Sequence, residues 1–316
     1  MGCYDFRVQG REPVSYQRNQ SILYKITSPQ MLAGRLRLSR AELDALLADA
    51  DPYKRWVDRK SGRSIQEPRP RLARVHRRIA ALLARIDTPP YLHSAKKGRS
   101  YISNAAAHSV DDGCVKIDVR RFYPSARAQE VYHFFLDRMA CDGDVAGMLA
   151  KLLTVDGHLP TGSSASPIVS FFAYEDLFDE LAVLAEVSGC TMTVYVDDIV
   201  FTGAGATRRL LFEARRAIGK WHLHGHKTKL FRPGQPRIVT GVALTNNGLR
   251  LPNRRQVRIA EDQKLFDDLP LGREKLTVAR RLTGRLFEAS QIDAGWRVRA
   301  EAMAAQRDDI QRKIGR

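Results

Sequence analysis

The chain has 316 residues and carries 52 Lys and Arg against 35 Asp and Glu, for a formal net charge of +17. It contains no run of the ~20 apolar residues that a membrane helix requires, and its first residues lack the apolar core of a secretory signal. The four cysteines are scattered and form no CxxC pair, which argues against a zinc site or a disulfide framework. We therefore expect a reduced, cytoplasmic protein without a membrane partner.

The basic excess is uneven along the chain. Residues 51–100 hold 14 Lys and Arg against 4 Asp and Glu. A surplus of this size attracts polyanions and speeds their capture, which favours nucleic acid as a partner. A basic surface that serves only solubility is the alternative.

The first hundred residues show helical and hairpin patterns. Ser28 and Ser39 are N-cap candidates for short helices, and Tyr53 to Pro68 is predicted to form a hairpin. The segment that ends before Pro89 has apolar residues at helical spacing and arginines on the opposite face, which predicts an amphipathic helix. The apolar positions are Leu72, Val75, Ile79, Leu82, Leu83 and Ile86, and the basic positions are Arg71, Arg74, Arg77, Arg78 and Arg85.

The rest of the chain mixes strands and helices. Two short β-rich runs, TMTVY and DIVFTG, are joined at Val196-Asp197 and predict a tight hairpin. The other expected elements are a buried strand at 114–119, a helix from 124 to about 139, a long apolar helix from about 168 to 187, a helix over about 206–221, strands near TKLFR and RIVTGVAL, and helices from about 251 onward. This order predicts an α+β fold with an antiparallel sheet backed by helices.

Three aspartates belong to the apolar strands of this region. Asp118 ends one strand, and Asp197 and Asp198 lie at the tip of the hairpin. Adjacent carboxylates repel each other, so an apolar hairpin that presents both is expected to hold a cation. Two metal ions bound by carboxylates can drive phosphoryl transfer, and Mg²⁺ prefers such ligands. Solvated turn acids are the alternative, and we interpret Asp111-Asp112 in that way.

The segments CVKIDVRRFYPS, LPTGSSASP and TVYVDDIVFTG resemble, in this order, the motifs of reverse transcriptases, particularly the bacterial retron-type enzymes. The resemblance covers roughly residues 20–316. It implies an RNA-directed DNA polymerase with a right-hand-like fold. The implied parts are an N-terminal helical segment (1–50), fingers (51–113), a palm with interleaved fingers parts (114–247) and a helical thumb (248–316).

The resemblance also implies a catalytic centre. Asp118, Asp197 and Asp198 would hold two Mg²⁺ ions, for which Mn²⁺ could substitute, with Val119 beside them as a further ligand. Lys227 matches a lysine that would protonate or attract the leaving pyrophosphate. The alternating histidines near it are expected to belong to a mixed surface strand or loop and not to a metal site.

Five residues match nucleotide-binding positions of the family. Tyr123 matches an aromatic gate beneath the nucleotide sugar, which would favour deoxynucleotides; a buried core aromatic is the alternative. Arg63 and Arg99 match fingers positions that could clamp the triphosphate, since guanidinium fits phosphate bidentately. Thr161 and Gly162 lie in the loop that would support nucleotide and template, but Thr161 stands where the family usually has Gln.

Two short segments resemble retron motifs. They are Asn104-Ala105-Ala106-Ala107-His108, which is similar to Asn-Ala-x-x-His, and Val239-Thr240-Gly241, which is similar to Val-Thr-Gly. His108 as a satisfied core histidine is the alternative for the first. RNA contacts are expected from Asn104, His108, Val239, Thr240 and Gly241, and from the thumb residues Arg280, Arg281 and Arg285.

A retron-type enzyme would use a structured noncoding RNA as template and would prime from an RNA 2′-hydroxyl. Its product would be a branched RNA–DNA hybrid, in a setting of anti-phage defence with a separate effector protein. Two alternatives stay open. One is another bacterial defence or mobile-element reverse transcriptase without 2′-priming, and the other is an RNA-binding scaffold whose polymerase site is idle.

Overall fold

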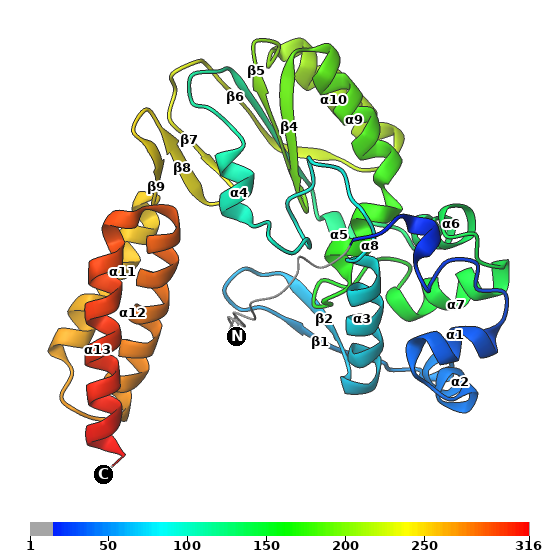
Figure 1. Ribbon diagram of the computed structural model, residues 1–316, viewed down its shortest axis with the longest axis horizontal. Helices are drawn as coiled ribbons and strands as arrows, with labels where there is room; N and C mark the ends of the chain where they lie inside the picture. The colour runs from blue at the N-terminus through cyan, green and yellow to red at the C-terminus, as the bar shows by residue number, and fades with distance from the viewer. Residues whose placement is uncertain (1–14, 316) are drawn as a thin grey trace. The chain divides into compact units, whose positions relative to one another are not determined.

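The computed structural model describes residues 15–315, which divide into two compact units (Figure 1). Within the described part, the first unit comprises 15–97, Val119–Leu181 and Arg215–His226, and the second comprises Gly98–Asp118, Ala182–Ala214 and 227–315. The expectation about the N-terminal residues falls on 1–14, outside the described part. No helix in residues 15–315 is both long enough and apolar enough to cross a bilayer.

The first unit begins with capped helices and a hairpin, as the sequence predicts. The Ser28 hydroxyl accepts from the Met31 N–H at 3.2 Å, and Ser39 forms a reciprocal capping box with Glu42. Strands β1 and β2 pair antiparallel with Tyr53 opposite Pro68. The elements are α1 (Pro29–Leu36), α2 (Arg40–Ala48), β1 (Tyr53–Val57), β2 (Ser64–Pro68) and α3 (Pro70–Leu83).

Helix α3 confirms the amphipathic pattern. Proline at its first turn has no N–H to leave unsatisfied, so the helix starts there without cost. Its buried side chains are Leu72, Val75, His76, Ile79, Leu82 and Leu83, whereas Arg71, Arg74 and Arg77 are exposed. The polar member of the buried face, His76, was absent from the predicted apolar pattern.

Two predicted helices are interrupted in the structure. The helix expected from 124 to about 139 divides at Ala126, which is extended because its carbonyl accepts from the Leu159 N–H at 3.0 Å. The helix expected from 168 to 187 divides at Tyr174, whose hydroxyl accepts from the Arg127 N–H at 3.2 Å. The resulting elements are α5 (Phe122–Ser125), α6 (Ala128–His133), a π-helical turn (Phe134–Arg138), α7 (Gly143–Leu153), α8 (Ser166–Ala173) and α9 (Glu175–Val187).

The second unit contains two sheets. The four-stranded sheet has the order β4-β5-β3-β6, and β5 pairs antiparallel with both β4 and β3. The smaller antiparallel sheet has the order β7-β8-β9. Their strands are β3 (Cys114–Val119), β4 (Cys190–Tyr195), β5 (Asp198–Gly203), β6 (Gly225–Phe231), β7 (Arg237–Val239), β8 (Val242–Thr245) and β9 (Gly248–Arg250), and α10 is Arg208–Lys220.

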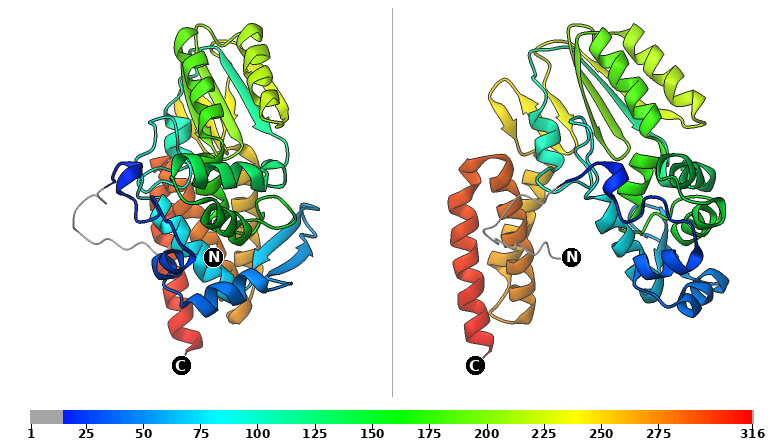
Figure 2. Two further views of the ribbon diagram at one scale, coloured as in Figure 1. Left: turned by 90° about the vertical axis from the view of Figure 1, so that its right-hand side faces the viewer. Right: turned by 45° about the vertical axis from the view of Figure 1, so that its right-hand side comes forward.

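Three C-terminal helices stand side by side in this unit (Figure 2). They are α11 (Asn253–Asp268), α12 (Arg273–Ile292) and α13 (Arg297–Ile314). Their buried side chains, among them Leu282 and Leu286, belong to one core cluster with Val239 and Val242 of the small sheet and Val200 of β5. Helices combined with antiparallel sheets are thus confirmed, and the assignment of fingers, palm and thumb stays a prediction.

Candidate active site

The hairpin expected at Val196-Asp197 is confirmed, and it places two aspartates opposite each other. Strands β4 and β5 pair up to Tyr195 and Asp198, so Val196 and Asp197 form a two-residue turn. Asp118 of β3 is the direct partner of Asp198 in the antiparallel ladder. Directly opposed residues have Cα atoms roughly 4.5–5.5 Å apart, so residues far apart in sequence bring their carboxylates to one point of the sheet.

An apolar scaffold holds these carboxylates. Side chains alternate between the two faces of a strand, so Asp118 shares a face with Lys116 while Ile117 points to the other face and is fully buried. On β5, Ile199 is fully buried as well. Burial of one face fixes the strand register, because a slip of one residue would move the aspartates into the core.

The turn between the two strands is strained. Val196 has φ 58°, a left-handed conformation that β-branched residues rarely adopt. The favoured two-residue hairpin turns place Gly or Asn at such a position. Holding a non-glycine residue in this conformation costs of order 1–3 kcal/mol of conformational free energy, and such strain often accompanies functional sites.

A lysine that the sequence analysis did not single out contacts the candidate site. The Lys116 ammonium lies 3.1 Å from Asp198 Oδ1 and 3.3 Å from Oδ2, and both side chains are about four-fifths buried. Its place two residues before Asp118 was the available sequence signal, since this spacing puts both side chains on one strand face. The site therefore already attracts one positive charge.

The donor set suits a hard cation but is not assembled around one. Carboxylate oxygens are the ligands that Mg²⁺ prefers. Within residues 15–315, however, no three His, Cys, Asp or Glu side chains are grouped so as to hold a metal ion. The Lys116 ammonium lies against Asp198, so it neutralises part of the charge that a divalent ion at Asp118 and Asp198 would use.

The two retron-like motifs meet in the structure. Asn104 of α4 (Tyr101–Ala106) donates from Nδ2 to Thr240 Oγ1 at 3.4 Å, and Thr240 donates to the Tyr101 carbonyl at 2.8 Å. Val239 ends β7, and Thr240 and Gly241 form the turn to β8 with φ 43° and 83°. Asn104 and Val239 are fully buried, so these two side chains hold α4 to the small sheet. RNA contact by the motifs stays a prediction.

His108 also has a structural position. Its Nδ1 lies 2.8 Å from Thr202 Oγ1 and its Nε2 lies 2.7 Å from Thr193 Oγ1, and the ring is buried. Thr193 and Thr202 belong to β4 and β5, so His108 ties both arms of the aspartate hairpin together. This geometry is that of a satisfied core histidine, the alternative that the sequence left open.

The thumb arginines differ in what they contact. Arg281 and Arg285 both bind the carboxylate of Asp262, which is only 6% exposed. Arg280 lies 3.3 Å from Gln311 of α13. The ion cluster joins α11 to α12, so it gives Arg281 and Arg285 a packing role whether or not they contact RNA.

Two further expected residues belong to the second unit. Lys227 is exposed on β6, the strand beside β3, and has φ 47°. Arg99 is half-buried just before α4. The roles of Lys227 and Arg99 toward pyrophosphate and triphosphate stay predictions.

The remaining expected residues belong to the first unit. Tyr123 is half-buried in α5 with its ring 6.0 Å from that of Phe122. Val119 is buried at the end of β3. Arg63 is exposed and precedes β2. Their predicted contacts to metal and nucleotide stay predictions.

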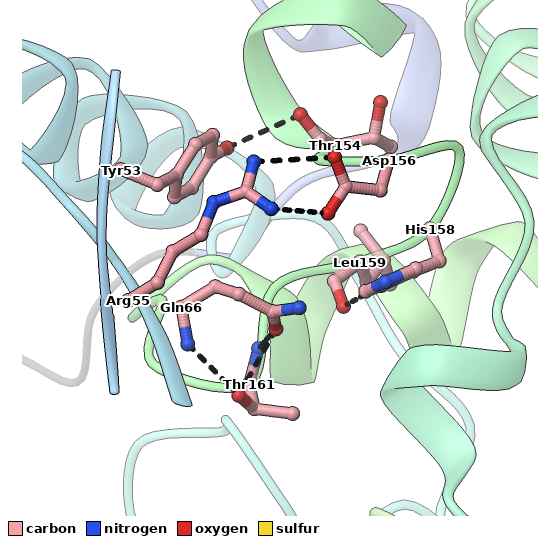
Figure 3. A network of polar contacts seen from close by, with 8 residues as sticks. All are labelled: Tyr53, Arg55, Gln66, Thr154, Asp156, His158, Leu159 and Thr161. Carbon is pink, nitrogen blue, oxygen red and sulfur yellow. Dashed lines mark hydrogen bonds and ion pairs between the residues drawn. The ribbon is translucent and has the colours of Figure 1, made fainter. Parts of the chain in front are cut away.

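The loop that carries Thr161 and Gly162 is attached to β2 (Figure 3). Thr161 Oγ1 donates to the Ser64 carbonyl at 2.8 Å and accepts from the Gln66 N–H at 3.2 Å. Gly162 donates to the Gln66 carbonyl at 3.0 Å, and a Cβ at Gly162 would lie 2.8 Å from that oxygen. The close approach requires glycine. The side-chain amide of Gln66 contacts Thr161, the position where the family motif usually has Gln.

Helix α3 supports the same loop through a buried histidine. His76 Nδ1 accepts from the Ser163 hydroxyl at 2.5 Å, and Nε2 lies 2.7 Å from the Leu152 carbonyl. Burial lowers the pKa of His76 to about 4, so its ring is neutral near pH 7. Sequence patterning missed this contact because His76 reads as one more polar residue in an arginine-rich helix.

Comparison with known proteins finds similarity to retron reverse transcriptases. The chain is 30% identical over 187 residues to the retron Se72 reverse transcriptase of Salmonella heidelberg, covering 56% of this chain and 48% of the relative. It is 30% identical over 228 residues to the retron Mx65 reverse transcriptase of Myxococcus xanthus, covering 64% and 53%. It is 24% identical over 221 residues to the retron Ec86 reverse transcriptase of Escherichia coli, covering 66% and 68%.

The chain spans about half the length of the first two relatives. No protein-family model matches it. The similarity agrees with the order of the sequence motifs and with the opposed aspartates on β3 and β5. By these matches, the chain is a homologue of the retron reverse transcriptases.

Proposed function

We propose that the protein is an RNA-directed DNA polymerase that copies a structured noncoding RNA. The observation that carries this proposal is the direct pairing of Asp118 with Asp198 beside a strained hairpin turn. It occurs in a chain whose relatives are named retron reverse transcriptases. Carboxylates from separate strands are the ligand arrangement that two-metal phosphoryl transfer needs.

The proposed chemistry assigns a role to each residue of the centre. Asp118, Asp197 and Asp198 supply the oxygen ligands. Divalent ions bound there would supply charge neutralisation on the phosphate oxygens and a more acidic attacking hydroxyl. Lys227, exposed on the strand beside β3, would attract or protonate the pyrophosphate. Tyr123 would exclude ribonucleotides through its ring.

We further propose the retron mode of synthesis. The primer is a 2′-hydroxyl of the RNA, the product is a branched RNA–DNA hybrid, and the setting is anti-phage defence in the cytoplasm with a separate effector protein. The names of the relatives support this mode, and the meeting of the Asn104 and Thr240 motifs is consistent with it.

The experiment is to sequence nucleic acid that co-purifies with the protein expressed with its native flanking DNA. The comparison is the Asp197→Asn/Asp198→Asn variant, which keeps side-chain size and removes both charges. We expect a short DNA of unique sequence, joined to RNA through a 2′-linkage and absent from the variant. DNA without a 2′-linkage to RNA would support the polymerase activity and contradict priming from a 2′-hydroxyl.

The alternative of an idle RNA-binding scaffold has one observation in its favour. The Lys116 ammonium contacts Asp198, one of the carboxylates that the metal ions would need. RNA without DNA in both preparations would support the scaffold. Restored DNA synthesis in vitro with added Mg²⁺ or Mn²⁺, lost in the variant, would reject it.

A further inference from the structure

Two grooves flank helix α3 in the first unit. One, of about 710 Å³, lies between α3 and the α1–α2 pair, and the other, of about 530 Å³, lies between α3 and the end of the β1–β2 hairpin. Arg74 lines both grooves, so they adjoin across the exposed face of the helix. We call this surface the α3 track, defined by Arg37, Lys54, Arg69, Arg71, Arg74, Arg77 and Arg78.

Most of the track's cations have no carboxylate partner. Arg69 forms an ion pair with Asp51 at 2.5 Å. Among the described residues, none of the other six has a carboxylate oxygen within ion-pair distance. Arg78 donates to a backbone carbonyl, that of Arg35, and Lys54 lies over the Trp56 ring at 5.4 Å.

The acids near the track do not balance it. The grooves contain three carboxylates, those of Glu42, Asp49 and Glu67, against the seven cations. Burial lowers the pKa of Arg78, and repulsion from the nearby guanidinium groups of Arg37 and Arg85 lowers it further. Other exposed cations of the first unit differ in this respect: Arg40 is paired with Asp44 and Arg138 with Asp176.

We propose that the α3 track binds the phosphate backbone of RNA. Guanidinium groups fit phosphate bidentately, and a row of them without a carboxylate partner in residues 15–315 is ready to exchange counterions for phosphates. Arg71, Arg74 and Arg78 span about 10 Å along the helix at ~1.5 Å per residue. A nucleic-acid strand advances ~3.4 Å per phosphate, so this row can meet about three successive phosphates.

The shape of the surface favours RNA over an anionic membrane. A membrane-bound helix presents a wide apolar face to the lipid, whereas the apolar face of α3 is buried in the unit. The exposed side of the helix is concave on both flanks and lined by arginine. Such a surface recognises a backbone by charge and shape and carries no base-specific readout. The choice of RNA as the partner rests on the proposed function, whereas the ability of the arginines to bind phosphate does not.

The test measures the salt dependence of RNA binding by the full chain. The track variant is Arg71→Gln/Arg74→Gln/Arg77→Gln. The matched control is Arg40→Gln/Arg138→Gln/Lys220→Gln, which removes the same charge from cations that are already paired in the same unit. The probe is an RNA hairpin of about 16 base pairs, a length that one RNA-binding module can cover. Circular dichroism melting checks that each variant folds.

We expect the track variant to lose affinity at least ~10-fold and its log Kd–log[salt] slope to fall by about 2, near 0.7–0.9 per lost phosphate contact. The control should change the slope by less than about 0.5 on the same scale. Equal loss in the track variant and the control would overturn the proposal, as would an unchanged slope. Arg→Lys at the three track positions should restore most of the slope, because charge is retained.

Two further arms separate this proposal from the proposed function. All binding is repeated in the Asp197→Asn/Asp198→Asn background, so that the result does not depend on DNA synthesis. If the wild-type protein makes no DNA but the track variant still binds RNA more weakly, the polymerase proposal is wrong and the proposal for the α3 track is retained. Binding of phosphatidylserine vesicles that depends on the track, without a track effect on RNA, would overturn RNA as the partner.

Discussion

Helices α3 and α12 look alike in sequence but use their arginines differently. Both bury an apolar stripe and carry several arginines on other positions. On α12, Arg281 and Arg285 converge on the buried carboxylate of Asp262. On α3, Arg71, Arg74 and Arg77 line open grooves and have no carboxylate partner within residues 15–315. A count of basic residues therefore does not distinguish the two helices, whereas the pairing of those residues does.

The sequence favours Arg280, Arg281 and Arg285 for RNA contact because they lie in the expected thumb, and that role stays a prediction. Asp262 is 19 and 23 residues away from Arg281 and Arg285, so no local pattern could reveal the cluster. Four substitutions, taken from the largest expected effect to the smallest, test what paired cations and neutral buried contacts each contribute.

Removing the shared carboxylate should have the largest effect. Asp262→Asn leaves two guanidinium groups facing a neutral, buried amide, so we expect the free energy of unfolding to fall by about 3 kcal/mol. Chemical denaturation measures the change. The control is Asp268→Asn, an exposed acid on the same helix that should cost less than about 0.5 kcal/mol. If Asp262→Asn were as mild as the control, α12 would have to be regarded as an open basic face like α3.

The buried side of α3 should respond to acid. Burial lowers the pKa of His76 to about 4 from its ordinary value of 6.5, so the unfolded chain binds the proton first as the pH falls. The stabilisation by neutral His76 is complete above pH 6.5 and is lost progressively as the pH falls toward 4. The loss amounts to about 3 kcal/mol at 1.36 kcal/mol per pKa unit.

Urea denaturation at several pH values between 7 and 4 measures this dependence. His76→Gln should be less stable at pH 7 and should show a flatter profile across that range. Arg77→Gln supplies the control, since this exposed residue of the same helix stays charged throughout the range and its removal should keep the wild-type profile. An unchanged profile in His76→Gln would mean that other groups cause the acid sensitivity of the unit.

The same contacts show how far a sequence can be interpreted. Periodicity predicted α3, and alternation with a two-residue break predicted the turn at Val196-Asp197, because both signals are local. The interruption at Tyr174 was missed, and the hydrogen bond between its hydroxyl and the Arg127 N–H joins residues 47 apart, which no local pattern could indicate. The aspartates could be found from motifs, but the Lys116 contact depends on strand register. The polar contacts that attach the loop at Thr161 to β2 are likewise tertiary.

Lys116 differs from both sets of arginines. It is paired with Asp198, a carboxylate that would bind a metal ion in the proposed function. Lys116→Met should lower the stability of the metal-free protein by about 1–2 kcal/mol, because Asp118 and Asp198 then repel each other without compensation. The variant should bind Mn²⁺ more tightly by several fold, which electron paramagnetic resonance of free Mn²⁺ can measure.

Two substitutions control this result. Lys116→Arg keeps a cation near Asp198 and should stay close to the wild type in both measurements. Lys264→Met removes an exposed lysine from α11 and should change neither stability nor Mn²⁺ binding. Weaker Mn²⁺ binding in Lys116→Met would mean that the lysine helps to arrange the carboxylates and does not compete with the metal.

The smallest effect should come from a neutral contact, the one between Thr161 and β2, the strand that leads into α3. Thr161→Val keeps the shape but removes the donor to the Ser64 carbonyl and the acceptor for the Gln66 N–H. We expect a loss of about 1 kcal/mol in unfolding free energy and faster hydrogen exchange at the Gln66 amide. Thr161→Ser retains the hydroxyl and serves as the control.

RNA binding should not respond to this substitution. Because the α3 track depends on charge, the salt dependence of RNA binding should be the same in Thr161→Val as in the wild type. A reduced slope would show that the position of β2, and not only the unpaired arginines, determines how the track meets phosphate.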